Sequence, residues 1–161
     1  MPLKLACARV DDRRVILRIK YASRFAYALS AAEIDAIVAT SRRSNVRVGV
    51  TGVMLAFGGV FMQVLEGPPD VVSDLFLRIE RDPRHRDVVI LRRELAAVPL
   101  FGAWSMRLVE LDAGARAQMR PARELIEAVA QGALPELERL REIEDLVWTA
   151  GARGVASRRA G

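Results

Sequence analysis

Hydrophobic and polar residues alternate from Val15 to Ser23, which predicts a strand with one buried face. Two apolar runs follow later, and Gly58-Gly59 between them is a hairpin signal because both turn positions accept positive φ. The second of these runs is apolar on both faces, as is typical of a strand in the middle of a sheet. The sequence predicts five strands in all, over residues 15–23, 50–57, 60–66, 87–95 and 103–109.

Two helices are predicted between these strands. Ser30-Ala31-Ala32-Glu33 is a capping box, so a helix begins there and is expected to run to about Ser44. Pro69 is placed to open a second helix, and Asp82-Pro83 ends it. The order β-α-β-β-α-β-β predicts a ferredoxin-like α+β fold, with a five-stranded mixed sheet and both helices on one face.

The composition changes after about Leu111, where Ala, Glu, Arg and Leu predominate. A last amphipathic helix is predicted from an apolar stripe made of Leu137, Leu140, Ile143 and Leu146/Val147. We expect the C-terminal helices to cover the second face of the sheet, where Arg18 and Lys20 could meet glutamates of the last helix. The expected organisation is an N-terminal extension over 1–14, a compact domain over 15–110, a helical appendage over 111–150 and a disordered tail over 151–161.

The chain of 161 residues carries a formal net charge of +5, which first suggests an anionic partner such as nucleic acid. The basic residues are scattered, however, and with 6% aromatic residues a base-stacking platform is not expected. One cysteine and one histidine exclude an internal disulfide and leave little for a metal site. No apolar run reaches the roughly 20 residues that span a bilayer, and the N-terminus does not resemble a secretory signal. A cytoplasmic protein with no membrane partner is therefore predicted.

Gln63 is the unusual residue, because it lies in an otherwise apolar strand. A buried amide without partners costs about 1–3 kcal/mol, so something polar should meet it. A bond to another side chain or a trapped water would be the ordinary explanation. Ordinary structural roles also exist for the other candidates: a satisfied strand hydroxyl for Tyr21, a helix end or turn for Asn45, core packing for Trp104 and Met106, and a solvated loop for Arg84 and His85.

Taken together, several blocks of this sequence resemble the BLUF family of blue-light sensors that use FAD, in the order and spacing of that family. The blocks are Tyr21-Ala22-Ser23, Ser41 to Arg47, Val50-Thr51-Gly52, Gly58 to Pro68, Arg81 to Val88 and Phe101 to Met106. The resemblance runs from about Val15 to Leu108. Ser44 departs from it, since a larger polar residue often precedes the asparagine, and so does Lys20, where an apolar residue is common.

The resemblance implies a flavin between the two helices, FAD in the first place, with FMN or riboflavin as alternatives. It implies that Asn45 binds the pyrimidine end of the ring and that Arg84 and His85 bring positive charge to the ribityl chain and phosphates. Tyr21 and Gln63 would form a hydrogen-bonded relay to the flavin, and Trp104 and Met106 would modulate it. The implied cofactor-binding residues are Tyr21, Ser23, Ser41, Asn45, Gln63, Arg84 and His85.

Three functions are compared on this basis. The resemblance implies a photoreceptor, in which light leaves the flavin oxidised but with a new hydrogen bond and a small red shift of its spectrum. Such a protein is a switch rather than an enzyme, and we expect it to signal to a separate effector protein and to form a homo-oligomer, a dimer or larger. A ferredoxin-like nucleic-acid binder and a small flavin-dependent redox enzyme are the alternatives, although no catalytic constellation or phosphate loop supports the latter.

Overall fold

The computed structural model describes residues 15–102, 105–111, 113–133, 136, 138–139, 141–143 and 145. The expectations for the N-terminal extension, the tail over 151–161, Trp104 and most of the last apolar stripe lie outside these residues. The elements are β1 (Ile16–Phe25), α1 (Ala31–Val48), β2 (Thr51–Phe57), β3 (Val60–Gly67), α2 (Pro69–Glu80), β4 (His85–Ala96), β5 (Arg107–Val109), α3 (Ala113–Gln118) and α4 (Arg120–Ala130). No helix in the described part of the chain is both long and apolar enough to cross a membrane.

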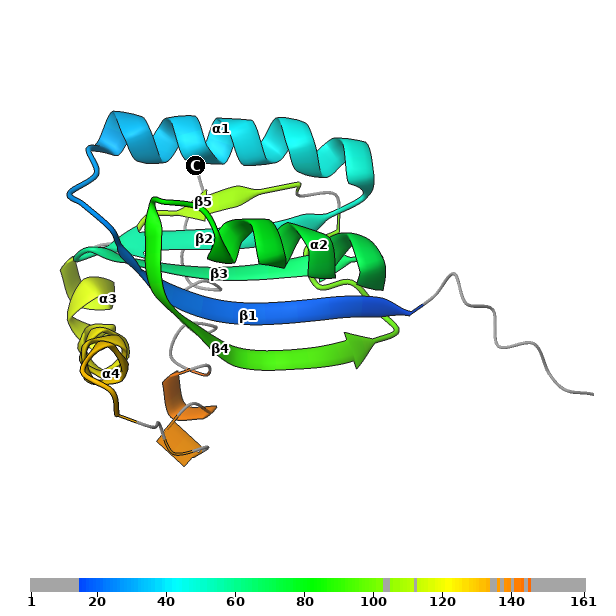
Figure 1. Ribbon diagram of the computed structural model, residues 1–161. Helices are drawn as coiled ribbons and strands as arrows, with labels where there is room; N and C mark the ends of the chain where they lie inside the picture. Colours follow the sequence, from blue (N-terminus) through cyan, green and yellow to red (C-terminus); the bar gives the residue numbers. More distant parts are fainter. Residues whose placement is uncertain are drawn as a thin grey trace, which may run out of the picture.

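The five strands form one mixed sheet in the order β4-β1-β3-β2-β5, as Figure 1 shows. All neighbours are antiparallel except β2 and β5, which run parallel. The central strand β3 is buried along its whole length, which explains why it is apolar on both faces. The predicted α+β fold with a five-stranded mixed sheet is confirmed. In the register of β1 and β3, Tyr21 lies opposite Gln63.

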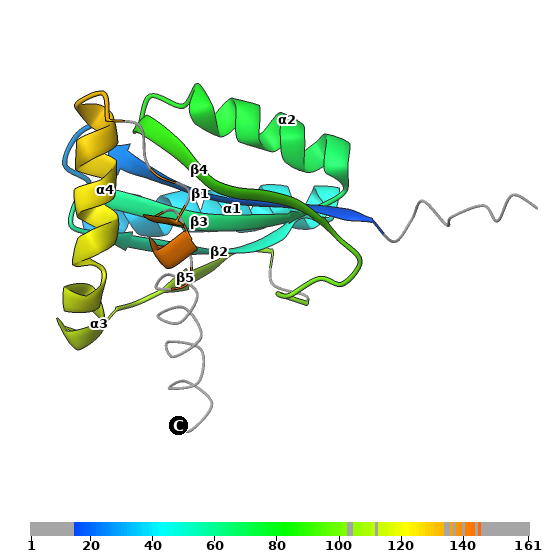
Figure 2. The same cartoon turned by 90° about the horizontal axis from the view of Figure 1, so that it is seen from below.

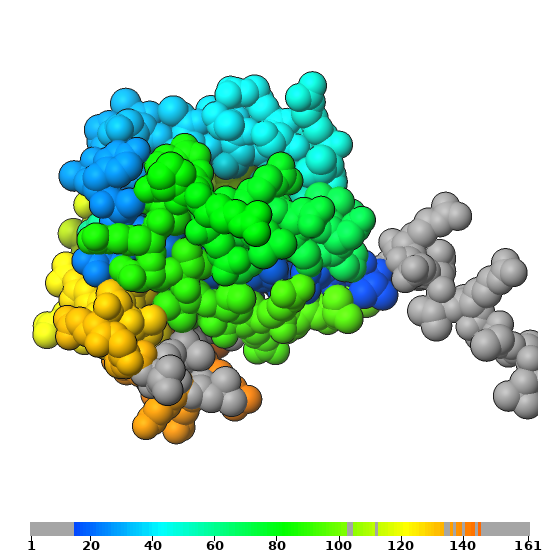
Figure 3. Space-filling model, in the orientation of Figure 1, coloured from blue at the N-terminus to red at the C-terminus, as the bar shows by residue number. Residues whose placement is uncertain are grey.

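Each face of the sheet has its own apolar core. On one face, α1 and α2 pack over residues of alternate positions in β1 and β3, including Ile19, Phe61 and Leu65. On the other face, Leu125 and Ile126 of α4 pack on Ala22 and Met62, together with Ile143 further along the chain, all of them buried. Figure 2 shows α2 on one side of the sheet and the helical residues around position 143, in orange, on the opposite side. Figure 3 shows the outer surfaces of α1 and α2 side by side on one face of the molecule.

Two boundaries differ from the sequence-based expectation. Helix α1 ends at Val48, one turn beyond Ser44, because Gly49 supplies the left-handed C-cap with φ 70° and donates its N–H to the Asn45 carbonyl. Of the two ordinary roles expected for Asn45, the structure shows the helix end, because Asn45 lies in the last turn of α1. Strand β5 contains only Arg107 to Val109, fewer residues than the predicted strand over 103–109. The capping box at Ser30 and the Gly58-Gly59 turn, with φ 54° and 80°, are confirmed.

Candidate functional site

A buried hydrogen bond joins Tyr21 of β1 to Gln63 of β3 on the face covered by α1 and α2. Tyr21 is 1% exposed and Gln63 is 4% exposed, and the phenol donates its hydroxyl proton to Gln63 Oε1. The tyrosine ring meets Phe76 of α2 edge-on, with the ring centroids 5.2 Å apart. Burial, and to a lesser extent the Asp82 carboxylate, raises the pKa of Tyr21 far above its ordinary value. The phenol is thus held neutral, with its proton directed at the glutamine.

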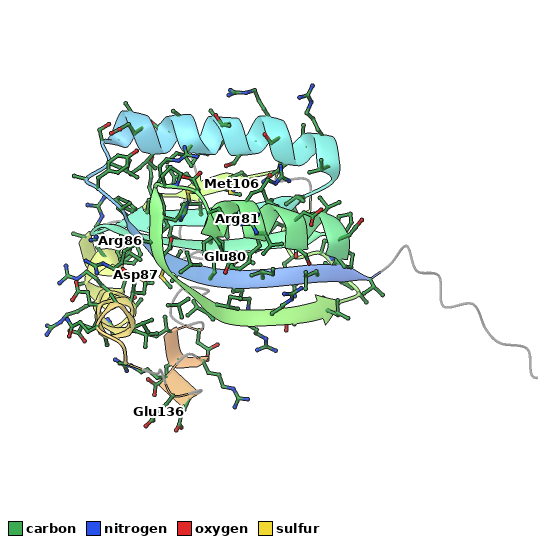
Figure 4. The ribbon with its side chains drawn as sticks, in the orientation of Figure 1. Glu80, Arg81, Arg86, Asp87, Met106 and Glu136 are labelled. Carbon is green, nitrogen blue, oxygen red and sulfur yellow. The ribbon has the colours of Figure 1, made fainter. Side chains whose placement is uncertain are left out.

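The amide nitrogen of Gln63 has a poor partner. It donates to Met106 Sδ at 3.5 Å, and a thioether sulfur is a weak acceptor. Met106 itself is buried in the core under α1 and α2, and Figure 4 shows it between these two helices. A strong donor inside the protein therefore faces a place where a carbonyl oxygen or a ring nitrogen would serve it better.

Helix α1 holds the chain next to Met106. Asn45, which is 2% exposed, donates its side-chain amide to the Ser105 carbonyl at 2.7 Å. Arg42 donates from Nε to the Met106 carbonyl, also at 2.7 Å. Ser41 lies one turn before Asn45 and shares its side of the helix. The backbone around Met106 is thus fixed to α1, and its side chain is fixed to β3.

His85 and Ser23 form a second polar pair on the same face. Ser23 Oγ lies 2.7 Å from His85 Nδ1, and the imidazole lies over Phe61 with centroids 4.7 Å apart. Burial lowers the pKa of His85, and Arg84 adds to this effect, although Asp82 opposes it. His85 is therefore neutral at pH 7. Burial thus disfavours the positive charge that the resemblance implies for His85, and its role toward a ribityl chain and phosphates stays a prediction.

Protonation of His85 should make the protein less stable in mild acid. The unfolded chain binds a proton at the ordinary pKa of about 6.5, whereas the folded chain resists it, so stability rises with pH through this range. The urea midpoint should fall between pH 7.5 and pH 5.5, and this fall should be larger for the wild type than for His85→Gln. The variant removes the single histidine of the chain. An equal fall in both proteins would contradict the buried neutral imidazole.

Arg84 is engaged by the helix-terminating aspartate. Asp82 accepts from the Arg84 backbone N–H and from its guanidinium, at 2.9 Å to Oδ1 and 2.5 Å to Oδ2. The Arg84 hydrogen bonds lower the pKa of Asp82 to about 2. The Arg84 side chain is 39% exposed, so its guanidinium can still reach a ligand at the surface. Part of its charge, however, is neutralised by Asp82.

Residues 16–107 match the family model described as sensors of blue-light using FAD. The chain belongs to the BLUF family. One curated relative of this BLUF domain is the photoactivated adenylate cyclase subunit beta of Euglena longa, 41% identical over 71 residues. Another is the blue light- and temperature-regulated antirepressor BluF of Escherichia coli (strain K12), 37% identical over 79 residues. These matches cover 44% and 49% of this chain, but only 8% and 20% of the relatives.

Solved structures resemble this BLUF domain over a larger part of the chain. The dark-state structure of BlrB, described as a BLUF protein, matches with a TM-score of 0.60 and 33% identity, over 80% of this chain and 96% of that one. The photo-activated state of BlsA has a TM-score of 0.62 at 24% identity, over 80% of this chain and 91% of that one, and thus supports the fold. The protein is a blue-light sensor with FAD as its cofactor.

The buried polar side chains fit such a cofactor. Gln63 presents an amide nitrogen whose present acceptor is a thioether, and the flavin ring offers better acceptors. Tyr21, Ser23, Asn45 and Gln63 are each nine-tenths or more buried on the face under α1 and α2, where an isolated polar group would otherwise be costly. When bound, FAD supplies the absorption of blue light and an oxidised ring that can accept hydrogen bonds.

The structure brings some of the predicted residues together and leaves others apart. Tyr21, Gln63 and Met106 form one connected group, and Asn45 joins it through the Ser105 carbonyl. Arg84 lies apart, paired with Asp82 in the turn before β4. Sequence reasoning missed Arg42, which holds Met106, and interpreted Asp82 only as a helix terminator. Arg42 bonds to the Met106 carbonyl and Asp82 bonds to the Arg84 guanidinium, and no feature of the sequence around either residue indicates such a contact.

The expectation for Arg18 is wrong. Arg18 does not meet the last helix in the described structure, because it pairs with Glu66 of β3 and Glu94 of β4, both at 3.0 Å. Glu66 is 1% exposed and was not singled out from the sequence, where it closes a strand and could be taken for a solvated end residue. The β4–β5 loop lies against this ion pair, since Leu100 and Phe101 donate backbone N–H groups to Glu66.

Proposed function

We propose that this BLUF domain works as a hydrogen-bond switch rather than as an enzyme, with the Tyr21–Gln63 pair as the photoactive relay. The observation that carries the proposal is the buried contact chain from the Tyr21 hydroxyl through Gln63 to Met106 Sδ. In this arrangement the amide oxygen of Gln63 faces the phenol and its nitrogen faces the sulfur. Rotation or tautomerisation of the amide would exchange its donors and acceptors without moving the backbone.

Burial gives this switch two discrete positions. An amide left without partners inside the protein costs about 1–3 kcal/mol, so Gln63 must be bonded before and after the change and is not held in between. The neutral phenol of Tyr21 can donate a proton or share it, and its raised pKa keeps it from ionising in the dark. Light would therefore bias a pre-existing pair of arrangements.

The change should reach the backbone through Met106. If the Gln63 nitrogen turns away, Met106 loses its donor, while Arg42 and Asn45 still hold the Met106 and Ser105 carbonyls. Strand β5 begins directly after Met106 and pairs with β2 at the edge of the sheet. An edge strand with three residues can shift at low cost in hydrogen bonds, so β5 is a suitable transmitter.

Infrared difference spectroscopy tests the relay directly. In protein with 15N in the glutamine side-chain amides, we expect light-minus-dark amide bands that shift with the label. These bands should be absent in Gln63→Leu, which leaves the other glutamines of the chain in place. Label-insensitive bands in the wild type would show that the Gln63 amide keeps its arrangement in the light.

A separate effector protein is the proposed receiver of the signal. Support comes from relatives whose names describe a light-regulated cyclase subunit and a light-regulated antirepressor, although this chain spans only a small part of each. A hollow of about 340 Å³ beside the Gly58-Gly59 turn is lined by Arg116, Arg120 and Arg123, which suits an acidic partner segment. The cytoplasm as location and a homo-oligomeric state remain predictions from the sequence.

Helix α4 is the proposed output element of the second face. Its buried residues contact Ala22 and Met62, which are the neighbours of Tyr21 and Gln63 along the strands. We expect light to change hydrogen exchange in residues 120–130, and Gln63→Leu to abolish that change. Equal exchange in light and dark would place the output elsewhere. Deleting α4 by ending the chain near Glu110 would test the same role less cleanly, because the deletion exposes the apolar core that α4 covers.

The structure also bears on the two alternative functions. A ferredoxin-like nucleic-acid binder needs an open sheet face for base stacking, and here α1 and α2 cover one face while α4 packs on the other. A flavin-dependent enzyme would need a second substrate site with a general acid or nucleophile, and the described polar residues near Gln63 supply none beyond the switch itself. The family match favours the photoreceptor over both.

A further inference from the structure

A buried ion pair lies on the face of the sheet opposite the switch. Glu66 follows Gln63 by three positions on β3, so its side chain points to the other face. It accepts from Arg18 Nε at 3.1 Å and from Nη2 at 3.0 Å, and the two side chains are 1% and 7% exposed. Two charges placed in this position need full hydrogen bonding, since a lone buried charge is strongly unfavourable.

The remaining bonds of this pair go to the β4–β5 loop. Glu66 accepts from the backbone N–H groups of Leu100 and Phe101 at 2.8 and 2.9 Å. Arg18 donates from Nη2 to the Val98 carbonyl at 3.0 Å. In this loop Val98 is 69% exposed and Leu100 is 48% exposed, whereas the Phe101 side chain is buried against Val53 and Val64. The backbone of residues 98–101 is held by the buried charges in addition to this apolar contact.

The same stretch of chain ends in the switch. Five residues after Phe101, Met106 receives the amide of Gln63 on the opposite face. Residues 98–101 and Met106 are therefore attached to β3 at two places, the former through Glu66 on one face and the latter through Gln63 on the other. Light is proposed to change the contact between Gln63 and Met106. The bonds from Leu100 and Phe101 to Glu66 are not part of that change.

We infer that Glu66 is the positioning residue that keeps residues 98–101 in place when Met106 moves. Glu66 holds the backbone of Leu100 and Phe101, so these residues do not move when Met106 moves. The displacement of Met106 is therefore passed to β5, which begins at the next residue. Without that hold, only the packing of Phe101 on Val53 and Val64 would restrain the loop, and its backbone would absorb more of the change. This inference rests on the proposed Gln63 switch and adds a fixed point to it. Bonds from backbone N–H groups to a carboxylate are about twice as strong as neutral ones, which suits that role.

The test compares Glu66→Gln with Glu94→Gln in the full, FAD-loaded chain. Glu66→Gln keeps the shape but replaces the charged acceptor of the two loop amides. Glu94→Gln removes a charge from the same Arg18 cluster, where Glu94 accepts from Arg18 and Arg92, and it leaves the bonds from Leu100 and Phe101 to Glu66 in place. It is therefore the matched control. Both should retain the light-induced red shift, because neither touches Tyr21 or Gln63.

Two readouts decide the outcome. Dark recovery should change by about fivefold or more in Glu66→Gln, as expected from weakening bonds to a charged group, and stay close to wild type in Glu94→Gln. In wild-type protein, light should alter hydrogen exchange over residues 105–109 and leave 98–101 unchanged. In Glu66→Gln the light-induced change should spread into 98–101. Wild-type recovery together with an unchanged exchange pattern in Glu66→Gln would overturn the inference.

A milder variant covers the case in which Glu66→Gln does not fold. Thr51→Val removes the hydroxyl that donates to Glu66 Oε1 at 3.1 Å and keeps the charge and the branched shape. It should move recovery in the same direction by a smaller factor, and no change in either readout would again contradict the role of Glu66. Failure of the underlying switch is distinguishable, since the wild type itself would then show no shift that depends on Gln63.

Discussion

Gln63→Leu is expected to bind FAD and to show no light-induced red shift. Leucine has nearly the volume of glutamine but no donor or acceptor, so the amide that faces Tyr21 and Met106 disappears while the packing of β3 stays filled. Because the red shift is attributed to a new hydrogen bond that this amide makes possible, its loss should be complete rather than partial. The measurement is the absorption spectrum before and after blue light.

A control on the same strand separates this effect from a general disturbance of the core. Met62→Leu changes the neighbouring residue, which is fully buried on the opposite face, by a swap that conserves volume. It should retain both FAD and the red shift. If Gln63→Leu shifts like the wild type, the buried amide is a structural feature and the relay assignment is wrong.

Tyr21→Phe should also retain FAD and lose the red shift. The phenyl ring keeps its edge contact with Phe76, but the proton that the phenol donates to Gln63 is gone. Without that donor, Gln63 keeps only its weak bond to Met106 Sδ, and its amide oxygen is left in a buried site at a cost of about 1–3 kcal/mol. The variant should therefore be somewhat less stable to urea as well as insensitive to light.

The second tyrosine of the chain gives a matched control for this substitution. Tyr27 is 52% exposed and lies outside the buried relay. Tyr27→Phe removes the same oxygen atom and should leave both the shift and its dark recovery unchanged. A Tyr21→Phe protein that cycles normally would show that the phenolic proton is not needed, and the proposed sequence of events would have to start elsewhere.

The sequence predicted the parts of this molecule that depend on local patterns. The alternation in β1 placed Tyr21 and Ser23 on the buried face, and the Gly58-Gly59 turn set the β2–β3 hairpin that puts Gln63 in the middle of the sheet. The capping box at Ser30 fixed where α1 begins. The interpretation of Gln63 as a buried polar residue in need of a partner followed from its apolar neighbours alone.

Long-range pairing decided what the sequence could not predict. Arg18 and Glu66 are 48 positions apart, and each looks like an ordinary exposed charge in its own strand. The neutral state of His85 depends on its burial beside Phe61 and Ser23, whereas its sequence neighbours are two arginines. The engagement of Arg84 by Asp82 likewise depends on the turn that brings them together.

The absorption spectrum of the purified full-length chain, recorded in the dark, after blue light and during return to darkness, tests the central claim most directly. We expect the bands of oxidised flavin, a small shift to the red on illumination, and complete thermal recovery with the flavin still oxidised. A flavin-containing protein whose spectrum does not change in blue light, or one that bleaches to a reduced form and stays there, would contradict a Tyr21–Gln63 hydrogen-bond switch.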